Sequence, residues 1–507
     1  MKKLFTFFTI IFIFVLNTFA VSYKISNYEF SVEGAGFKFL GKTKEQALIT
    51  KYPIDTNTEF QTEDDLLHYI NEYKKQLESA RAFDYVDISY ETDLNNTEET
   101  ESVILKFNIK DSHHLLILPY AKYDSNNGFE AKFKIKDSNF LGSLNKLSSD
   151  ITLNLSNKGI EPGISFSYDY PFNVGKLNIE WVNDYDFSYV ISNSSPEWDL
   201  KTGLKLVQPY ESYSFVYEFY QYFFKNLEYE PYDDDLYFSE EISFSVPIIL
   251  NKLKNFSNLY YTPKISLVTN WDFDGISKYN DYLSSPLVTI GHSLSNEKIF
   301  WDDCFRSGYS FTITNNYLYN IQRGDFSPYF ELDAKFYYSY QLHDWPILDK
   351  FAINSNLYAF TYVDFPQNSF IYGNKIGSRL RGYLDKNYFG NELPLYTASS
   401  AIVLNIDLPH HLFTTTFSKD ILNFNLQASP FFDMALVYDR NTDRLFSLKD
   451  GYYCAGLEFL VYPLKWASYT IRASYGVDLR GLINDDSGLL RGLWNNKELF
   501  IGIGLQY

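Results

Sequence analysis

Apolar and polar residues alternate along most of the chain, from about residue 115 to its end. This period of two predicts β-strands with one apolar and one polar face, and turn residues such as those at 124–128 separate the runs. A β-sandwich alternates in the same way, but a region of this length would need several domains, and the sequence contains no linker between them. Clear examples are Ile151/Leu153/Leu155, Ile164/Phe166/Tyr168/Tyr170 and Phe330/Leu332/Ala334/Phe336/Tyr338/Tyr340.

The pattern is typical of a transmembrane antiparallel β-barrel, in which one face of each strand meets lipid and the other a polar lumen. At roughly 9 to 11 residues per spanning strand plus turns, residues 115–507 hold about 16 strands, and about 14 or 18 also fit. Composition agrees, because 19% of the residues are aromatic and Tyr and Phe number 45 each. Girdles of such rings at two membrane interfaces would account for the excess.

The last eight residues, Phe500–Tyr507, alternate in the same way. One face would carry Ile501, Ile503, Leu505 and Tyr507, and the other Gly502, Gly504 and Gln506. We expect this strand to close the barrel against the first strand, about Leu115–Tyr123, with the final aromatic ring at a membrane interface. An edge strand of a soluble sheet is the alternative. The two glycines would weaken packing at the seam and favour a gate, although glycines are as common where a barrel bends.

The beginning of the chain resembles a secretory signal peptide, residues 1–20. Lys2 and Lys3 precede an apolar stretch from Leu4 to Leu16, and Thr18-Phe19-Ala20 then offers small residues at the positions that a signal peptidase reads. No cysteine follows the cleavage site, which argues against lipid attachment. No later run approaches the roughly 18 to 20 apolar residues of a transmembrane helix. The mature protein is therefore expected to be exported, and to enter a membrane only as a barrel.

Residues 22–112 follow a different pattern, in which alternation gives way to a helical period and then returns. A short helix is predicted around residues 43–50, and a longer one after Thr62, where Thr62-Glu63-Asp64-Asp65 is close to a capping box. The apolar stripe of the longer helix needs a sheet to cover. The stripe comprises Leu66, Leu67, Ile70, Tyr73 and Leu77, and strands at 86–90 and 103–109, joined by an acidic loop at 95–101, supply the sheet. The prediction is a small α+β domain, β-α-α-β-β, of about 90 residues.

Charge and chemistry narrow the possible functions. The net charge of −19 excludes a general nucleic-acid binder, which needs a surplus of Lys and Arg. Cys304 and Cys454 permit at most one disulfide, and a buried pair of thiols is at least as plausible. Residues 291–295 fall one residue short of a nucleophile elbow, and the adjacent histidines at 113–114 and 410–411 would point to opposite faces of a strand. We therefore expect no enzyme, no cofactor and no metal site.

A glycine-rich loop, residues 372–383, holds the most informative charged residue. Arg381 lies in it next to Gly382, and a guanidinium prefers carboxylate partners on rigid elements. Two acids in strand-like segments, Asp407 and Asp433, are candidates, and strand parity permits both to face the lumen.

Several motifs resemble those of the BamA-like outer-membrane insertase and two-partner-secretion transporter superfamily. Leu380-Arg381-Gly382-Tyr383 is similar to its (V/I/L)-R-G-(F/Y) loop, and Phe431-Phe432-Asp433-Met434 to its F-(F/W/Y)-D-x-G strand motif. Asp407-Leu408-Pro409 stands where that family has an acidic strand segment before a proline, and residues 22–112 resemble a POTRA domain. Each motif is short, whereas their order along the chain is specific.

The resemblance implies a lock in which the loop folds back into the barrel. Arg381, with Gly382 and Tyr383, would pair with Asp433, and Asp407 would be a second acid; a rim salt bridge of little energetic value is the alternative. The resemblance also implies the bacterial outer membrane, with the POTRA-like domain in the periplasm. Its partners would be outer-membrane lipids, unfolded β-rich client proteins or one secreted partner, and accessory periplasmic proteins.

Two departures from that family leave the function open. Ala435 stands where the family usually has glycine, and the chain has room for one POTRA-like domain and no plug helix. The first possibility is insertion or translocation of clients through a lateral gate by strand augmentation. A dedicated pore for one exoprotein and a passive porin or adhesin are the alternatives.

Overall fold

The structure is a computed structural model of the 507-residue chain. The described residues are 22–35, 41–93, 100–124, 128–156, 159–192, 194–253, 257–277, 280–302, 304–341, 350–362, 376, 379–382, 399–418, 423–439, 444–466, 469–484, 486 and 488–503. The predicted signal segment 1–20 lies outside them, as do Tyr383, Gly504, Leu505 and Tyr507. The chain forms two compact units, Met1–His113 with Leu141–Leu144, and His114–Phe140 with Asn145–Tyr507.

The first unit contains a four-stranded sheet in the order β2-β1-β4-β3, in which β1 and β4 are parallel and the other pairs antiparallel. This is the predicted small α+β domain, with one addition, the two-residue strand β2. Its elements are β1 (Ser22–Glu33), α2 (Glu45–Lys51), β2 (Glu59–Phe60), α3 (Glu63–Ser79), β3 (Phe83–Thr92) and β4 (Thr100–Asp111). The acidic loop predicted at 95–101 is shorter at its end, because Thr100 and Glu101 already belong to β4.

Helix α3 begins where the sequence predicts. The hydroxyl of Thr62 accepts a hydrogen bond from the backbone N–H of Asp65 at 3.1 Å, which satisfies one of the free donors of the first turn. Four of the five stripe residues are buried, but Leu67 is 38% exposed and is not part of the core. Leu67 follows Leu66 directly, so it points about 100° away from the buried face. The sheet contributes Ile25, Val103, Leu105, Phe107 and Ile109 to the same core.

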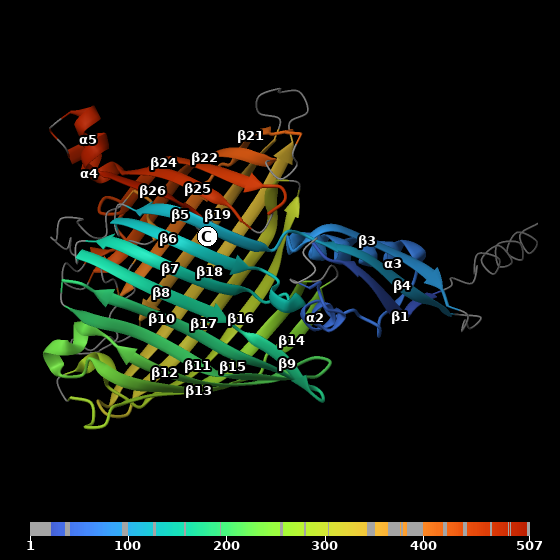
Figure 1. The fold of residues 1–507 in the computed structure, drawn as a ribbon, viewed down its shortest axis with the longest axis horizontal. Coiled ribbons are helices and arrows are strands. Elements are labelled where there is room, and N and C mark those ends of the chain that lie inside the picture. The colour runs from blue at the N-terminus through green and yellow to red at the C-terminus, as the bar shows by residue number, and fades with distance from the viewer. Residues whose placement is uncertain are drawn as a thin grey trace, which may run out of the picture. The chain divides into compact units, whose positions relative to one another are not determined.

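The second unit is a closed antiparallel barrel, in which β26 pairs with β5 (Figure 1). Its strands are β5 (Leu115–Asp124), β6 (Gly128–Asp137), β7 (Leu147–Ser156), β8 (Gly159–Tyr168), β9 (Tyr170–Val174), β10 (Leu177–Val190), β11 (Ser195–Pro209), β12 (Ser214–Lys225), β13 (Leu236–Ser245), β14 (Ile248–Leu253), β15 (Ser257–Trp271), β16 (Leu287–Asp302), β17 (Phe305–Asn320), β18 (Asp325–Gln341), β19 (Lys350–Tyr362), β20 (Ser400–Asp407), β21 (His410–Thr414), β22 (Phe424–Asp439), β23 (Arg444–Leu445), β24 (Tyr452–Pro463), β25 (Ile471–Asp478) and β26 (Lys497–Ile503). Two short helices, α4 (Leu479–Asn484) and α5 (Leu489–Asn495), join β25 to β26.

The predicted fold class, a mainly β chain with a small α+β domain before an antiparallel barrel, is confirmed, but the strand number differs. Four strands are each interrupted once, so that β8 and β9, β13 and β14, β20 and β21, and β23 and β24 face the same neighbours. In the described part of the chain, 18 strands therefore form the barrel wall, not about 16. Several strands are longer than the spanning length used in the estimate, such as the 16-residue β16 and β17, so chain length alone was a poor guide to strand number.

The barrel wall is apolar outside and polar inside. In β8, Ile160, Ile164 and Phe166 are exposed, whereas Ser165 and Ser167 between and after them are half-buried. Lysines and carboxylates meet on the inner face of neighbouring strands, as Lys134 and Asp150 do at 2.6 Å. This inside-out pattern is the one expected of a wall that lipid surrounds.

Strand directions define two ends of the barrel. We call the end at which β5 begins, at Leu115, the proximal end, and the opposite end the distal end. Because β26 is antiparallel to β5 and β25 to β26, the α4–α5 connection lies at the distal end. None of the helices in the described residues is long and apolar enough to cross a membrane. The side chains of Cys304 and Cys454 are buried as thiols.

Candidate functional site

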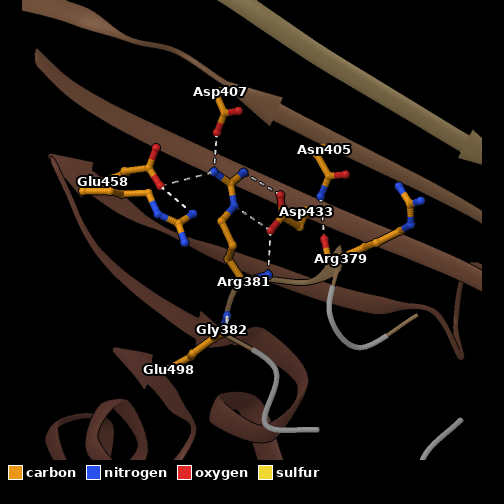
Figure 2. A network of polar contacts seen from close by, with 9 residues as sticks. Arg379, Arg381, Gly382, Asn405, Asp407, Asp433, Glu458 and Glu498 are labelled. Atoms are coloured by element: carbon orange, nitrogen blue, oxygen red, sulfur yellow. Dashed lines mark hydrogen bonds and ion pairs between the residues drawn. The ribbon is translucent and has the colours of Figure 1, made fainter. Parts of the chain in front are cut away.

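Charged side chains cluster on the inner face of one part of the barrel wall. Successive residues of a strand point to opposite faces, so Asp433 and Glu458 face the lumen while their neighbours Phe432 and Leu457 are exposed outside. The cluster consists of Asp407 on β20, Asp433 on β22, Glu458 on β24, Arg472 on β25 and Glu498 on β26. These strands are consecutive in the wall, and the arginine loop lies against them (Figure 2).

Arg381 is held by two carboxylates. Its Nε and Nη2 donate to the two oxygens of Asp433 at 3.0 and 2.7 Å, and its backbone N–H donates to the same carboxylate at 2.8 Å. Its Nη1 donates to Asp407 at 2.5 Å. The side chain of Asp433 is fully buried and that of Arg381 nearly so. A planar fork paired with one buried and one partly buried acid is a geometry that lysine does not reproduce, and it differs from the exposed rim salt bridge that was the alternative.

A second arginine, Arg472, extends the network toward β26, the strand that pairs with β25. Glu458 lies 4.0 Å from Nη1 of Arg381, as Figure 2 shows. It also lies 3.4 Å from Nη1 of Arg472, so its carboxylate contacts both guanidinium groups. Both Glu458 and Arg472 are buried. Alternating signs of this kind compensate for the cost of removing several charges from water.

An apolar contact accompanies the ionic one. Ile376 and Leu380 of the loop are almost fully buried against Ala401, Val403 and Ala435 of the wall. Ala435 is the position at which the related motif usually has glycine, and here its methyl group contributes to this apolar cluster. The loop is therefore seated by hydrophobic burial as well as by charge.

Phe431 forms the floor under Arg381. The guanidinium carbon lies 3.8 Å from the centre of the Phe431 ring, a cation–π contact. Phe431 is paired across the sheet with Gly456, and a Cβ at Gly456 would lie 2.5 Å from the ring. Glycine at this wall position leaves the space that the ring occupies.

The loop backbone packs directly on strand β25. Gly382 has φ of +102°, and a Cβ there would lie 2.5 Å from the backbone nitrogen of Val477. A Cβ on Gly476 would lie 2.8 Å from the carbonyl group of Arg381. Two glycines thus permit a contact between main chains, and Gly382 also needs the conformational freedom of glycine.

Gly382 also connects the loop to the last strand. Its backbone N–H donates to Oε2 of Glu498 on β26 at 2.6 Å. On the same inner face of β26, the Phe500 ring lies 3.9 Å from the guanidinium carbon of Arg472 and 5.7 Å from the ammonium of Lys122 on β5. The ring therefore reaches across the seam between β26 and β5.

The structure changes the interpretation of Gly502. A Cβ on Gly502 would lie 2.8 Å from the Phe500 ring and 3.4 Å from the side chain of Lys122. The space that glycine leaves at the seam is filled by these neighbours, so Gly502 does not leave the seam without side-chain packing. In the described residues, β26 and β5 pair at Phe500 with Asp124 and at Ile501 with Tyr123.

A buried tyrosine lies at the proximal end of the same seam. The hydroxyl of Tyr469, in the connection before β25, is 3.1 Å from the carbonyl oxygen of His114 and 3.2 Å from that of Lys136. The ammonium of Lys136 lies 4.5 Å from the Tyr469 ring. Burial raises the pKa of Tyr469, so the hydroxyl stays protonated and can donate. Tyr469 thus connects the β24–β25 side of β26 with the first two strands of the barrel.

The structure brings together three of the residues singled out in the sequence, Arg381, Asp407 and Asp433, with Gly382 beside them. Sequence reasoning missed Glu458, Arg472 and Glu498. A signal was present for Glu458, because it is an isolated acid at an inward position between Leu457 and Phe459 in an otherwise apolar strand. Glu498 carried no such signal, because it lies next to Lys497 at the start of a strand and looks like an ordinary exposed end.

Metal binding has no support among the residues that the structure describes, in which no three His, Cys, Asp or Glu side chains are arranged to hold an ion. His113 and His114 lie between β4 and β5, not within a strand, so strand parity does not apply to them. Nδ1 of His114 pairs with Asp137 at 2.5 Å, and its carbonyl oxygen accepts from the Ser138 backbone. The contacts of Arg381 with Asp433 and Asp407 hold the loop against the barrel wall.

Comparison with known proteins gives matches in structure only. No family model matches the sequence, and no curated protein matches it significantly. CdiB from Acinetobacter baumannii has a TM-score of 0.49 and 13% identity, over 95% of this chain and 73% of that one. CdiB from Escherichia coli has 0.47 and 10%, over 94% and 76%. BamA from Haemophilus ducreyi lacking POTRA domains 1–3 has 0.39 and 13%, over 94% and 84%.

Proposed function

We propose that this chain is an outer-membrane barrel of the BamA-like and two-partner-secretion type, which inserts or translocates client proteins at the seam between β5 and β26. The observation that carries the proposal is the bond from Gly382 to Glu498, because it ties the arginine loop to a strand of the seam. The loop is at the same time fixed to the wall by Arg381 with Asp433 and Asp407. One loop thus braces β26, which pairs with β5 at the seam.

The seam offers a physical route for templating β-structure. If β26 and β5 separate, each exposes a row of unpaired N–H and C=O groups, to which an incoming strand can add. The braced loop would keep β26 in place while β5 moves. Glu498 of β26 contacts the loop, and Arg472 of the neighbouring β25 contacts Glu458 of the charged network. Among the contacts described above, Lys122 of β5 touches the Phe500 ring alone. No covalent chemistry is needed.

The N-terminal domain would lie in the periplasm and receive clients or accessory proteins. Strand β3 is at the edge of its sheet, and β2 covers the other edge only opposite Tyr23 and Lys24. Tyr85 of β3 is exposed, which gives an extended partner an aromatic side chain to pack against. Such an edge is suited to β-augmentation.

Locking the seam tests the proposal. Tyr123 and Ile501 are direct partners across it, so Tyr123→Cys combined with Ile501→Cys places two thiols where oxidation can link them. The matched control is Phe219→Cys with Ile242→Cys, also direct partners and exposed, on β12 and β13. Each pair would replace the wild-type chain in a depletion strain.

We expect the oxidised seam pair to fold but to behave like depletion, and to recover on reduction, while the control pair stays active. Outer-membrane proteomics then identifies the class of client. A fall in many barrel proteins supports an insertase, and loss of one exoprotein supports a dedicated secretion pore. If the locked seam leaves both the barrel proteins and the exoprotein at normal levels, or if depletion changes neither level, the lateral gate is wrong and a passive porin or adhesin remains.

A further inference from the structure

The connection between β25 and β26 carries the most exposed apolar side chains of this part of the barrel. Leu490 and Trp494 of α5 are 84% and 71% exposed, compared with 56% for Ile151 in the wall. Ile483 of α4 and Leu489 of α5 are similarly exposed. Soluble loops rarely present a contiguous apolar surface of this kind, so a partner must normally cover it. We call α4 and α5 together the distal hairpin.

The distal hairpin lies on the outside of the barrel. On β25, Arg472 and Gly476 face the lumen, where they contact Glu458 and the arginine loop, so Tyr475 faces outward. The hydroxyl of Tyr475 donates to the carbonyl oxygen of Leu493 in α5 at 2.8 Å. The second helix is therefore fastened to the lipid-facing side of the wall. Figure 1 shows α4 and α5 standing off the wall beside β24 and β26.

The hairpin has the side-chain distribution of a helix in a membrane interface. In α5, Leu490 and Trp494 are four residues apart and share one face, while Arg491 and Asn495 share another. Lys497, the first residue of β26, lies over the Trp494 ring. A tryptophan with basic neighbours is typical of the headgroup region, where the ring is partly buried and the cations meet phosphates.

We propose that the distal hairpin is a membrane-interface element that places Ile483, Leu489, Leu490 and Trp494 in the lipid leaflet next to the seam. Tyr475 connects the outer face of the wall to the distal hairpin. Ile471 of β25 and Ile501 of β26 are exposed on that outer face. A client protein would instead need this surface to face water. The inference rests on the membrane location proposed above and is independent of any insertion activity.

The location would have a consequence for the seam. Both ends of the hairpin are fixed, by Arg480, which donates to the carbonyl oxygen of Asp450 at 3.1 Å, and by the backbone bond from Asp478 to Asn496 at 3.0 Å. A short amphipathic segment that is held rigidly at headgroup depth displaces lipid around it. Lipid packing would therefore be perturbed beside β26, where an inserted strand has to leave the barrel.

Site-specific labelling in vesicles tests the inference on the whole protein. The single substitution Leu490→Cys carries an environment-sensitive fluorophore on the apolar face, and Asn495→Cys is the matched control on the polar face of the same helix. Ile265→Cys, in the middle of β15, is the wall control. Unsubstituted protein measures background labelling of the buried Cys304 and Cys454. Purified protein is reconstituted in phosphatidylcholine vesicles with a lipid-borne shallow quencher or with iodide in the buffer.

We expect the lipid-borne quencher to remove much more of the emission at position 490 than at position 495, with iodide giving the reverse order. Equal exposure of 490 and 495 to iodide overturns the inference. Protection of 490 that grows with the protein-to-lipid ratio overturns it in favour of a second copy, and protection that appears only with added client favours a client surface. If iodide quenches the Ile265 label in the middle of the wall, the membrane location itself is wrong; if iodide reaches position 490 but not position 265, the barrel proposal stands and the hairpin inference falls.

Discussion

The carboxylate of Glu498 accepts a hydrogen bond from the backbone N–H of Gly382, although the two residues are 116 positions apart in the chain. Glu498 belongs to the last strand of the barrel and Gly382 to the loop that Arg381 fixes to the wall. The contact makes the position of a seam strand depend on a loop that is held at several other strands. Each part of this dependence can be removed separately.

Removal of Glu498 is expected to loosen the seam and leave the loop seated. In Glu498→Ala, Gly382 loses its partner on β26, but Arg381 keeps Asp433 and Asp407. A hydrogen bond to a charged group is worth about 1.5 to 3 kcal/mol. Amide hydrogen exchange at the paired residues Tyr123 and Ile501 should therefore become faster, while the control pair at Phe219 and Ile242 keeps its exchange rate. An unchanged seam rate would mean that the contact does not restrain β26.

Removal of the Asp433 charge is expected to release the loop itself. In Asp433→Asn, the buried guanidinium of Arg381 keeps only Asp407 as a directly bonded acid, and loss of one partner of a buried ion pair costs about 3 to 5 kcal/mol. Trypsin cuts after arginine, so cleavage after Arg381, identified by mass spectrometry, reports the opening.

We expect much faster cleavage after Arg381 in Asp433→Asn than in the unsubstituted protein. The matched control is Asp150→Asn, which removes a carboxylate that pairs with Lys134 on the inner wall at a distance from the loop in the sheet order. Equal protection of Arg381 in the Asp433 and Asp150 variants would show that the ion pair does not hold the loop.

The main-chain contact of Gly382 is testable without changing any charge. Gly382→Ala introduces a methyl group 2.5 Å from the Val477 nitrogen and also strains a backbone with φ of +102°. Gly324→Ala is the control, because Gly324 has φ of +71° and open space around it, so only the strain remains. Strain of this kind costs about 1 to 3 kcal/mol.

Trypsin sensitivity should separate the two glycine variants, and heat-modifiability on gels checks that each barrel still folds. We expect Gly324→Ala to keep the mobility shift of the folded barrel, and Gly382→Ala to show the trypsin sensitivity of the Asp433 variant as well. Comparable behaviour of the two variants would mean that the close approach to β25 contributes nothing beyond local strain.

Much of the fold follows from residue patterns that act locally. Thr62 caps a helix through the next turn, and Ile160, Ile164 and Phe166 occupy one face of a strand because of the backbone alone. The strand number did not follow, since strand length is set by hydrogen bonding to neighbours, and β16 and β17 extend each other well beyond the spanning minimum. The alternation of side chains along a strand showed that Asp407 and Asp433 could both face the lumen.

Parity does not identify contacts that depend on which strands become neighbours. Glu458 meets Arg472 because β24 pairs with β25, and Gly456 leaves room for Phe431 because β22 pairs with β24. Glu498 meets Gly382 only after the loop has folded inward, which no local pattern encodes. The loop motif itself was informative because the order of several short motifs, rather than the residues of one, pointed to a seat for Arg381.

The N-terminal domain is expected to lose stability at high pH. Burial raises the pKa of Tyr69 from 10.0 to about 12, and its hydroxyl accepts a hydrogen bond from the Asp55 backbone at 2.9 Å. The pKa of Tyr69 is higher in the folded domain than in the unfolded chain. The stability that neutral Tyr69 contributes is therefore complete below the unfolded pKa of about 10, and it is lost as the pH rises through the folded pKa.

The circular dichroism signal of α3 should therefore fall between the unfolded and folded pKa values of Tyr69. Tyr69→Phe cannot ionise, so its alkaline transition should move to higher pH, although the variant starts less stable because the Asp55 bond is lost. Tyr85→Phe, at an exposed position of the same domain, is the control and should leave the transition where it is. A Tyr69 variant with an unchanged transition would contradict the assignment.

The last prediction concerns the proximal end of the seam, where Tyr469 spans from the β24–β25 connection to the carbonyl oxygens of His114 and Lys136. Tyr469→Phe keeps the ring under the Lys136 ammonium and removes only the hydroxyl, a net loss of about 0.5 to 1.5 kcal/mol. Tyr453→Phe removes a hydroxyl that bonds the Leu448 carbonyl away from the seam, and is the control. If the seam opens from the proximal end, Tyr469→Phe should speed amide hydrogen exchange at residues 123 and 501 by about 2- to 10-fold, the rate change that this energy allows, while Tyr453→Phe leaves it unchanged. Combined with Glu498→Ala, an additive effect would mean that the loop and the tyrosine restrain opposite ends of the seam independently, and a smaller one would mean that a single opening motion breaks both contacts.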